Sequence, residues 1–413
     1  MTSTQGCMAC GTPGVQLLFS LGAMPPVNAF LEVSALSEEK AYPLDLFYCP
    51  SCTLVQLGAT VPPEELFSHY LHLSSASRSN IQHLNDVAHT ITERFHVNKN
   101  TRILEVGSND GTLLAQFLGT AGAMLGIDPA KNLLQLSQKR GVETVATFFS
   151  PEVADEIVHS RGLFDVVLAL NVVAHTPDFI GLLKAIRAVL APRGMFMMEA
   201  AYVLETLLQG EFDTIYHEHV YCFSLHALAV AYKRVGLAIV DVEKIPTQGG
   251  SLRVFARRQE DSYTASASVC KLLQDEKDRG LTEPATYAAV TSKVAQFKDD
   301  LRTRLRQVQT QHGHVVGLGA PARGVVLLNY CHIGPDDLAY VIDDTPLKQG
   351  KLVPGVHIPV VSWDKLTADQ PRAFLLLSWN YQHEIFEKLQ RYVQEATVIV
   401  PFPQLQVIEI GAT

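Results

Sequence analysis

The order of apolar and polar positions predicts a chain of alternating strands and helices. Residues 101–114 combine an apolar strand, a glycine turn and a helix, and residues 123–129 form a second strand that ends in an acid. Further strands are expected over 164–171 and 195–199, with helical periodicity over 179–190 between them. This alternation predicts a mainly parallel sheet with helices on its faces.

The same pattern recurs near the C-terminus. An amphipathic stretch over 286–311 precedes a second strand, glycine turn and helix over 314–324. Strands are then expected over 338–344, which ends in acids, and over 373–380, which ends in polar residues. The intervening residues 345–359 are rich in Pro, Gly and Lys. We therefore expect a second complete Rossmann-like unit.

Composition indicates a soluble globular protein of two or three domains. The chain has 413 residues, of which 47% are hydrophobic and 18% are charged, and this length exceeds one ordinary core. It has no uninterrupted run of about 18 apolar residues, which a membrane span needs, and its start lacks a signal-peptide pattern. A cytoplasmic enzyme is therefore expected. A net charge of −9 without a Lys/Arg cluster argues against nucleic acid as a partner.

Two CxxC pairs near the N-terminus predict a metal site. Thiolates at this spacing chelate one cation from a tight turn, and two such turns complete a closed, structural four-sulfur site. A redox CxxC and a coincidental clustering of cysteines are the alternatives. Strands are expected on either side of the second pair, over 44–48 and 53–57, and Cys222, Cys270 and Cys331 are expected to be buried thiols. The predicted zinc ligands are Cys7, Cys10, Cys49 and Cys52.

The first glycine turn carries residues suited to a nucleoside. Gly107 and Gly111 allow the backbone close to a ligand, and Asp128 at the next strand end is placed to accept hydrogen bonds from a ribose diol. The dinucleotide pattern G-x-G-x-x-G is absent. The pattern E-x-G-x-x-D-G instead resembles the methyl-donor site of class I S-adenosylmethionine methyltransferases, although Asn109 stands where that family commonly has glycine. A strand–turn–helix without a ligand is the alternative. The predicted cofactor-binding residues are Glu105, Gly107, Asn109, Asp110, Gly111, Asp128 and Asn171.

The second glycine turn offers a place for the other substrate. Backbone N–H groups at a helix N-terminus and the guanidinium of Arg323 are suited to a diphosphate. A docking domain without a ligand is one alternative. A nicotinamide site on Gly317 and Gly319 is another, although an isolated GxG pattern is weak evidence.

Six consecutive residues, Tyr216 to Tyr221, contain two imidazoles, one carboxylate and two phenols. Such a density of proton-transfer groups is what general acid–base catalysis on a polar substrate needs. The mixed aromatic and polar pattern favours an irregular loop. The alternatives are a hydrogen-bonded core network and a metal site that uses His217 and His219.

Taken together, these motifs resemble the sugar C-3′-methyltransferases, which methylate nucleoside-diphosphate 4-keto-6-deoxysugars. The likeness runs from about Cys7 to Pro403 and includes, in order, the four cysteines, E-V-G-S-N-D-G, Y-H-E-H, the glycine pair 249–250, G-x-G-A-x-A-[KR], Asp-Asp-Thr-Pro and Pro-Gly-x-x-I-P-V. The resemblance implies an α/β protein of three modules. These are a zinc-binding module (1–68), a class I methyltransferase Rossmann-like domain that binds S-adenosylmethionine (69–258) and a Rossmann-like nucleotide-sugar-binding domain (259–413).

The resemblance also implies roles for individual residues. Tyr216, Glu218 and His219 take the family's catalytic places, whereas His217 replaces an Asp and is expected to be a bystander. His175 matches a His that follows a strand of the methyl-donor domain. An aromatic residue ahead of that domain enters the family's site, and here His72 stands in its place. The residues expected to bind substrate are Tyr70, Gly249, Gly250, Gly319, Ala320, Arg323, Asp344 and Lys348.

The implied reaction needs a base and a hydrogen-bond donor. A sugar C-3 becomes nucleophilic only when its proton leaves, and an adjacent C-4 ketone makes that proton acidic. His219 is the predicted base because imidazole titrates near working pH, with Glu218 as its support and Tyr216 or His175 as donor to the enolate oxygen. A nicotinamide-dependent nucleotide-sugar oxidoreductase and a zinc-bearing binding protein with a degenerate methyltransferase fold are the competing hypotheses. The expected form is a monomer or small homo-oligomer without nucleic-acid or membrane partners.

Overall fold

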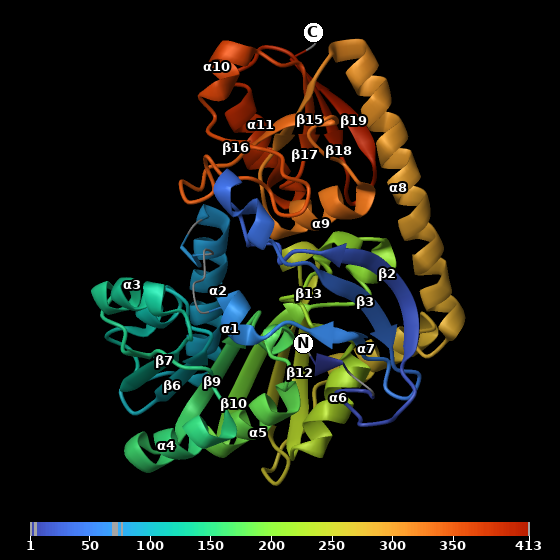
Figure 1. Ribbon diagram of the computed structural model, residues 1–413. Coiled ribbons are helices and arrows are strands. Elements are labelled where there is room, and N and C mark those ends of the chain that lie inside the picture. Colours follow the sequence, from blue (N-terminus) through green and yellow to red (C-terminus); the bar gives the residue numbers. More distant parts are fainter. Residues whose placement is uncertain (1, 4–5, 68–72, 76, 412–413) are drawn as a thin grey trace.

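The computed structural model of the protein describes residues 2–3, 6–67, 73–75 and 77–411. Its strands form three main sheets, one in each predicted module. In Figure 1 the C-terminal sheet lies at the top, the central sheet lies at the bottom, and β2 and β3 of the N-terminal module lie between them on the right. Tyr70 and His72, two residues with expected roles, lie outside the described residues.

The N-terminal module contributes three strands to a four-stranded antiparallel sheet of order β11-β4-β3-β2. The fourth strand, β11, comes from the central part of the chain, directly after the predicted acid–base loop. The N-terminal module is therefore joined to that loop by backbone pairing. The strands of this region are β1 (Thr2–Ser3), β2 (Gln16–Met24), β3 (Tyr42–Tyr48), β4 (Val55–Leu57), β5 (Ala59–Thr60) and β11 (Tyr221–Cys222).

The central sheet has seven strands in the order β12-β13-β10-β9-β6-β7-β8, and only β13 runs antiparallel to its neighbours. The chain leaves β6 toward β7 and β8 and then crosses back to β9. The carboxyl ends of β6 and β9 therefore form a topological switch point, where open α/β sheets bind ligands. The strands are β6 (Arg102–Val106), β7 (Ala123–Ile127), β8 (Thr144–Val145), β9 (Phe164–Leu170), β10 (Leu190–Ala201), β12 (Leu237–Ile245) and β13 (Ser251–Arg258).

The C-terminal sheet has six strands in the order β16-β15-β14-β17-β18-β19, all parallel except β19. Its switch point lies between β14 and β17, by the same argument. The predicted second Rossmann-like unit is thus present. The strands are β14 (Val315–Leu318), β15 (Leu338–Ile342), β16 (Val360–Val361), β17 (Ala373–Leu376), β18 (Ala396–Val400) and β19 (Gln406–Ile410).

Several helices begin where a side chain caps their free backbone N–H groups. The Ser77 hydroxyl accepts from Asn80 N–H at 3.1 Å at the start of α2, and the Asp178 carboxylate accepts from Gly181 N–H at 2.9 Å at the start of α5. Such caps satisfy donors that the helix leaves free. The α-helices are α1 (Pro63–Phe67), α2 (Arg78–Phe95), α3 (Leu134–Lys139), α4 (Pro151–Arg161), α5 (Phe179–Val189), α6 (Leu225–Arg234), α7 (Ala267–Asp278), α8 (Pro284–His312), α9 (Ala322–Cys331), α10 (Lys365–Asp369) and α11 (Gln382–Leu389). The 3-10 helices are η1 (Val33–Glu38), η2 (Leu114–Phe117), η3 (Lys131–Leu133), η4 (Val173–His175), η5 (Leu207–Gln209), η6 (Phe212–Thr214), η7 (Thr247–Gly249) and η8 (Trp379–Tyr381).

One hydrophobic cluster runs through all three modules. It includes buried residues of the N-terminal strands, the central domain and the C-terminal helices, such as Leu46, Phe212 and Val325. The long helix α8 runs along the right edge of the molecule in Figure 1, and Tyr287 near its start packs on Tyr48 with ring centroids 4.1 Å apart. Because burial of apolar surface is the main stabilising term, we expect the modules to fold as one unit.

Two expectations about local structure are wrong. The helix expected after the first glycine turn is only the 3-10 turn η2. It ends at once because Leu118 has extended ψ and Gly119 follows with a φ of +80°. Cys270 is an exposed thiol on α7, whereas Cys222 and Cys331 are buried as expected.

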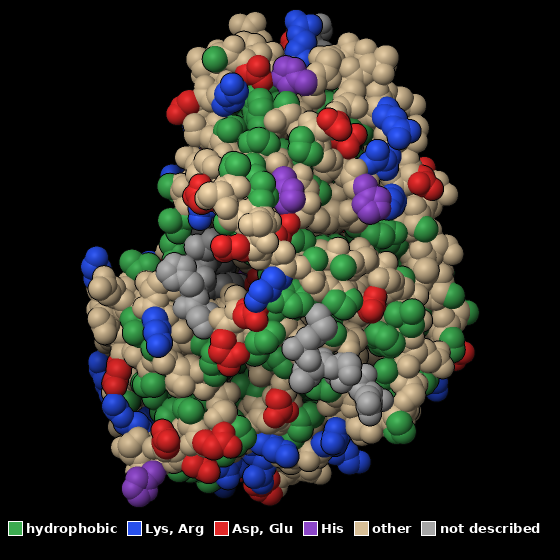
Figure 2. Space-filling model, viewed as in Figure 1, with side chains coloured by type: hydrophobic (Ala, Val, Ile, Leu, Met, Phe, Trp, Pro, Cys, Tyr) green, Lys and Arg blue, Asp and Glu red, His purple; other side chains and the backbone are tan. Residues whose placement is uncertain are grey.

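The surface carries both signs of charge. Figure 2 shows Lys and Arg intermingled with Asp and Glu on the face in view. Large exposed hydrophobic side chains include Leu17 and Leu347, which belong to separate modules. Among the described residues, no helix has both the length and the apolar character that crossing a membrane requires.

Candidate active site

The acid–base loop, residues 215–220, is irregular as expected and lies between η6 and β11. Two backbone hydrogen bonds hold its end: Val220 N–H donates to Ala174 O at 2.9 Å, and Leu57 N–H donates to Val220 O at 2.9 Å. Ala174 belongs to η4, just after β9. The loop is therefore attached to the N-terminal module and placed at the carboxyl end of the central sheet.

Tyr216 and His219 form a hydrogen-bonded pair within this loop. The Tyr216 hydroxyl lies 2.7 Å from His219 Nε2, and His219 Nδ1 lies 2.7 Å from Thr214 O. A carbonyl oxygen only accepts, so Nδ1 carries the ring proton, and Nε2 accepts the hydroxyl proton of Tyr216. A backbone hydrogen bond of 2.8 Å from His219 N–H to Tyr216 O brings the two side chains to one side.

The surroundings of this pair keep both groups neutral. Burial lowers the pKa of His219 well below its usual value, and the charges of His175 and Arg323 lower it further. Burial also raises the pKa of Tyr216 well above its usual value, with a further contribution from Glu218. His219 is therefore neutral at neutral pH, with an Nε2 lone pair that accepts a hydrogen bond from Tyr216 and is suited to accept a proton once that hydroxyl moves away.

His175 stacks on His219 from the central domain. Its ring, in η4, lies 5.0 Å from the ring of His219 at an interplanar angle of 23°. Phe67 of the N-terminal module stacks on His175 at 5.8 Å and 6°. The two expected catalytic histidines are thus adjacent, although 44 positions separate them in the sequence (175 and 219).

Glu218 lies where the three modules meet. Its carboxylate accepts a hydrogen bond from Asn28 Nδ2 of the N-terminal module at 2.5 Å. Lys348 of the C-terminal domain interacts with Glu218 electrostatically, and its ammonium lies 5.0 Å from the ring of Phe30. Burial lowers the pKa of Lys348, and the nearby acids Asp343 and Glu218 oppose that shift.

His217 faces away from the Tyr216–His219 pair. Its Nε2 lies 3.2 Å from Tyr42 O, and its ring meets the Tyr42 ring edge-on at 5.9 Å. Burial lowers the pKa of His217. Among the described residues, the only group of His, Cys, Asp and Glu that could hold a metal is the four-cysteine cluster, so the loop is not a metal site in the described part of the chain.

The first glycine turn has a backbone that glycine and asparagine adopt most readily. Gly107, Asn109 and Gly111 have φ values of +73°, +50° and +77°, and asparagine is among the few other residues that tolerate this left-handed region. Asn109 is therefore compatible with a turn that usually has glycine there. A Cβ atom on Gly107 would lie 2.9 Å from Val172, so the ends of β6 and β9 approach closely.

Three carboxylates surround this first turn. Asp128 accepts backbone N–H groups of Asn109 at 2.8 Å and Ala130 at 2.9 Å, which leaves further lone pairs on its oxygens. Glu105 is buried, and its Oε2 has no hydrogen-bond partner among the described residues. Burial first, and then the charges of Asp128 and Asp110, raise the pKa of Glu105 well above its usual value. A buried Glu105 oxygen without a partner among the described residues, beside an acid with further lone pairs, fits S-adenosylmethionine, which carries cationic and hydroxyl groups.

The second glycine turn repeats the backbone arrangement of the first. Gly319 has a φ of +85°. Asp343, at the end of β15, accepts the N–H of Ala320 at 2.7 Å and the N–H of Thr345 at 2.8 Å. Asp343 therefore has the position that Asp128 has in the central domain.

The acids and the lysine near the second turn differ in burial. Lys348 Nζ donates to Ala320 O at 2.8 Å and lies 4.0 Å from Asp343 Oδ2. Asp344 instead has a side chain that is 70% exposed and pairs with Lys388. The acid in the strand-end position is therefore Asp343 rather than Asp344, because β15 ends one residue before Asp343.

Arg323 is buried between the C-terminal and central domains. Its Nη2 donates to Glu211 Oε2 at 2.9 Å and to Asp213 Oδ1 at 2.7 Å. A Cβ atom on Gly249 would lie 2.4 Å from Glu211 Oε2, and the neighbouring Gly250 has a φ of +124°. The guanidinium thus faces two carboxylates of the chain itself, and the glycine pair lies beside this interface.

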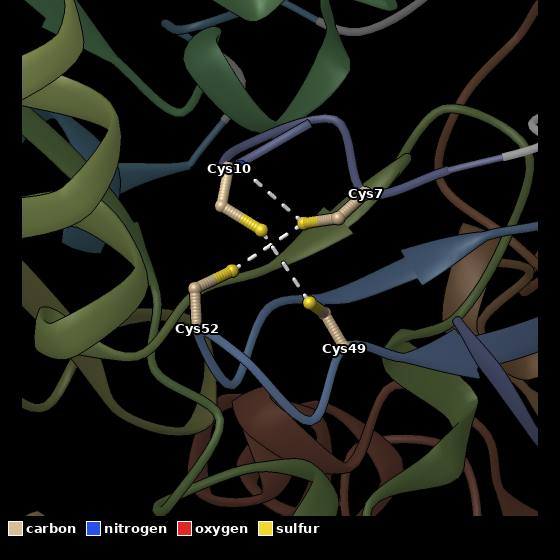
Figure 3. A group of neighbouring side chains, drawn as sticks. All are labelled: Cys7, Cys10, Cys49 and Cys52. Atoms are coloured by element: carbon tan, nitrogen blue, oxygen red, sulfur yellow. Dashed lines mark hydrogen bonds between the residues drawn. The ribbon is translucent and has the colours of Figure 1, made fainter. Parts of the chain in front are cut away.

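The four cysteines converge on one point. Figure 3 shows their side chains pointing toward one another from two turns, and all four Sγ atoms lie within 4.8 Å of each other. Sulfur atoms around a tetrahedral zinc, at about 2.3 Å from the metal, lie about 3.8 Å apart, so this donor set fits zinc. The two turns have the same form: Gly11 N–H donates to Cys7 O at 2.8 Å, and Thr53 N–H donates to Cys49 O at 2.9 Å. Both Gly11 and Thr53 have positive φ, at +76° and +61°.

Several residues of the site were not predicted. Asn28 lies in a segment without a recognisable motif. Thr214 takes part through its backbone carbonyl, which gives no side-chain signal, and Asp213 gains its role only through contacts with the C-terminal domain. Asp343 was also missed, because Asp344 was chosen in its place, although an acid at a strand end is a recognisable pattern.

Three family models match the chain in order. They are described as "Putative zinc binding domain" over residues 7–67, "Methyltransferase domain" over 78–242 and "C-methyltransferase C-terminal domain" over 246–403. The C-methyltransferase NovU of Streptomyces niveus is 34% identical over 409 residues, which is 98% of this chain and 97% of that protein. A ubiquinone biosynthesis O-methyltransferase of Azorhizobium caulinodans is 34% identical over 102 residues, 24% of this chain and 40% of that protein.

A solved magnesium protoporphyrin IX methyltransferase from Synechocystis PCC 6803 with bound S-adenosylmethionine matches 43% of this chain and 79% of that chain, with 12% identity and a TM-score of 0.33. The family models confirm the predicted methyltransferase fold with its N-terminal zinc-binding module and S-adenosylmethionine as cofactor. The relative of S. niveus matches nearly the full length of both proteins at more than 30% identity. The chain therefore belongs to the C-methyltransferase family and is an S-adenosylmethionine-dependent C-methyltransferase.

Proposed function

We propose that the protein transfers a methyl group from S-adenosylmethionine to C-3 of a nucleoside-diphosphate 4-keto-6-deoxysugar. The observation that carries this proposal is the Tyr216–His219 pair, stacked on His175 at the edge of the sheet that holds the methyl-donor turn. A neutral base close to the methyl donor is what C-methylation beside a ketone requires. Methyl transfer to an oxygen or nitrogen with its own lone pair needs less help from a base.

The residues divide the proton transfer between them. The bound cofactor supplies an electrophilic methyl group on a sulfonium. His219 Nε2 accepts the C-3 proton, and the electron pair of the C–H bond moves toward the C-4 oxygen as the enolate forms. For this step the Tyr216 hydroxyl turns from Nε2 to that oxygen, which frees the Nε2 lone pair and stabilises the charge on the oxygen. The enolate carbon would then form the new C–C bond with the methyl group as the methyl–sulfur bond breaks, so that S-adenosylhomocysteine leaves as a neutral thioether. The C-4 ketone returns, and the proton remains on His219.

The nucleotide part of the substrate fits the second glycine turn. Asp343 has the same backbone arrangement as Asp128, which supports contact with a ribose, and the buried ammonium of Lys348 supports neutralisation of a phosphate. Gly319 and Ala320 allow close approach to that turn. Glu218 and Lys348 join this site to the acid–base loop, so the sugar would extend from the turn toward His219.

A labelled methyl donor tests the proposal directly. The protein is incubated with S-adenosylmethionine that carries a ¹³C methyl group and with 4-keto-6-deoxysugars on thymidine or guanosine diphosphate, and NMR locates the label. A ¹³C–¹³C or ¹³C–¹H correlation at C-3 is the expected result. A methyl group on oxygen would contradict the proposal. Binding of NADH without binding of S-adenosylhomocysteine would favour the oxidoreductase hypothesis instead.

Exchange in D₂O tests the base step alone. With S-adenosylhomocysteine in place of the methyl donor, the C-3 proton of the correct substrate should exchange with solvent, because His219 removes it without methyl transfer. A substrate that is methylated yet shows no enzyme-dependent exchange under these conditions would argue for deprotonation concerted with methyl transfer.

A further inference from the structure

The segment just before the acid–base loop, Glu211–Thr214, is anchored in the C-terminal domain. Phe212 packs edge-on against Phe297, Tyr330 and Phe402, with ring centroids 5.5, 4.9 and 5.7 Å away. All three rings belong to the C-terminal part of the chain, and Phe212 is fully buried among them. The start of the loop is therefore held by a different domain from its end, which pairs with β4.

Polar contacts fix the next residue, Asp213, from the same side. Arg323 Nη2 donates to Asp213 Oδ1 at 2.7 Å, and the indole N–H of Trp379 donates to Asp213 Oδ2 at 2.8 Å. The Arg323 guanidinium also lies over the Trp379 ring at 4.3 Å. In Figure 1 α9, which carries Arg323, lies on the side of the C-terminal domain that faces the central domain. Both oxygens of a buried carboxylate are thus held by the C-terminal domain.

The residue after Asp213 sets the state of the base. Thr214 O accepts the Nδ1 proton of His219 at 2.7 Å, and this contact leaves the Nε2 lone pair for proton transfer. The Thr214 carbonyl lies in η6 with Asp213, so a shift of Asp213 would move the acceptor. Loss of that acceptor would free the other tautomer, which has no lone pair on Nε2.

We propose that Arg323 is a positioning residue for His219, acting through Asp213 and Thr214, instead of a ligand of the substrate's diphosphate. This inference rests on the proposed function for the role of His219 as base. An isolated buried carboxylate is costly, so Glu211 and Asp213 need the guanidinium between them. Recruiting Arg323 to a diphosphate would leave both carboxylates without that partner.

Charge supports the same assignment. Arg323 lowers the pKa of both Tyr216 and His219, after burial and, for Tyr216, opposed by Glu218 and Asp213. The other titratable neighbours of His219 include His175, which also lowers the pKa of His219, and Tyr216, whose hydroxyl lies 2.7 Å from Nε2. Burial raises the pKa of Glu211 to about 7, against the opposing effect of Arg323. The guanidinium charge therefore favours the neutral form of His219.

The experiment compares the two tryptophans of the chain. Trp379→Phe removes the hydrogen bond to Asp213 and keeps an aromatic face for Arg323. Trp363→Phe is the matched control, because Trp363 lies in the same domain and its indole nitrogen has no hydrogen-bond partner among the described residues. Arg323→Lys is the second variant: it keeps the charge and loses the planar fork.

The readouts are kcat, KM for the sugar nucleotide, affinity for S-adenosylhomocysteine and the ¹⁵N spectrum of His219. We expect Trp379→Phe and Arg323→Lys to lower kcat roughly 10- to 100-fold, as small misplacements of a catalytic group do. KM and cofactor affinity should stay within about twofold, and the Nδ1–H signal of His219 should lose population to the other tautomer. Both variants keep a positive charge at position 323. The acidic limb of the pH profile of kcat should therefore not move. Trp363→Phe should behave as the wild type.

Two results would overturn the inference. One is a raised KM for the nucleotide sugar with unchanged kcat in Arg323→Lys, which would make Arg323 a substrate ligand. The other is an unchanged His219 tautomer in Trp379→Phe, whether or not kcat changes. The NMR measurement needs no substrate, so it tests the positioning even if the wild-type protein methylates none of the 4-keto sugars and the proposed function fails.

Discussion

The two glycine turns share one backbone arrangement but differ in which groups have partners. At each turn a strand-end acid, Asp128 or Asp343, accepts two backbone N–H groups at 2.7–2.9 Å. At the first turn, Glu105 Oε2 and Ser108 Oγ are buried without a hydrogen-bond partner among the described residues. At the second, Lys348 already contacts the turn and the nearby Arg323 faces two acids of the chain.

The presence or absence of partners for these polar groups distinguishes the two glycine turns. Unpaired buried polar atoms cost free energy unless a ligand satisfies them, so the first turn is built to receive a cofactor. Near the second turn, Arg323 Nε is also buried without a partner among the described residues, but Arg323 Nη2, from helix α9, bonds to the segment that precedes the catalytic loop. The first turn thus has open groups for the cofactor, whereas the second turn, the proposed place of the nucleotide, belongs to a domain that also positions the loop.

Replacing the base should have the largest effect, because the loop between the two units carries the chemistry. We expect His219→Asn to lower kcat by about 10²- to 10⁴-fold while affinity for S-adenosylhomocysteine, measured by calorimetry, stays nearly intact. His217→Asn is the matched control, since His217 faces Tyr42 and should retain most activity. Loss of cofactor binding in His219→Asn, or full turnover, would contradict its role as base.

Removing a zinc ligand should destabilise the whole fold, including both the central and the C-terminal domains. Cys49→Ser leaves three thiols in a site whose two turns hold the start of the N-terminal sheet, and a structural four-sulfur site contributes folding energy directly. We expect loss of bound metal, measured by mass spectrometry, and a clearly lower Tm. A metal-free variant that remains folded and fully active would show that the site is dispensable.

A pair of equivalent substitutions tests the comparison most directly. Asp128→Asn should weaken binding of S-adenosylhomocysteine by about tenfold or more, because hydrogen bonds to a charged group contribute about 1.5–3 kcal/mol. Asp343→Asn, in the same backbone setting, should leave that affinity within about twofold. Equal losses in both variants would remove the distinction between the two turns.

The pH dependence of kcat reports how the C-terminal domain, through Arg323, influences the pKa of His219. The neutral form of His219 is the active one, and its pKa is lowered from 6.5 by burial, His175 and Arg323. Activity is therefore retained as pH falls through 6.5 and is lost only at lower pH, where His219 becomes protonated. An acidic limb at or above pH 6.5 would show that another group limits the reaction.

The smallest effect concerns the departure of the first turn from the family's usual glycine. Asn109 has a φ of +50°, and alanine is about 1 kcal/mol worse than asparagine or glycine in this region. Asn109→Ala should lower the free energy of unfolding by about that amount. Asn109→Gly should be nearly neutral, although it loses the hydrogen bond from Ser74 N–H to Asn109 Oδ1 at 2.9 Å. Urea denaturation distinguishes the two.

Local patterns predicted much of the fold. Apolar runs gave β6, β7, β9, β14 and β15, and the period of residues 286–311 gave α8, which the structure extends to Pro284–His312. The prediction of an α-helix after the first glycine turn was wrong, because a short 3-10 helix and one turn of an α-helix have similar apolar spacing. The pairing of β11 with β4 was out of reach, since two residues that pair across modules show no periodicity of their own.

The candidate site divides in the same way. Cysteine spacing, the strand-end Asp128 and the density of groups from Tyr216 to Tyr221 were visible because their chemistry lies in short stretches of sequence. The stacking of His175 on His219, the contact of Asn28 with Glu218 and the partners of Arg323 were not. The first joins residues 44 positions apart within the central domain, and the other two join residues from different modules.

The sequence by itself determined which groups the protein has for its chemistry: four thiols for zinc, a glycine turn with acids for the methyl donor, and a loop rich in proton-transfer groups. Only the tertiary structure decided their states. The proton of His219 sits on Nδ1 because Thr214 O is 2.7 Å away, and that carbonyl is held through Asp213 by Arg323 of another domain. Hydrogen bonds and burial fix tautomers and pKa values, and both depend on neighbours that are distant along the chain.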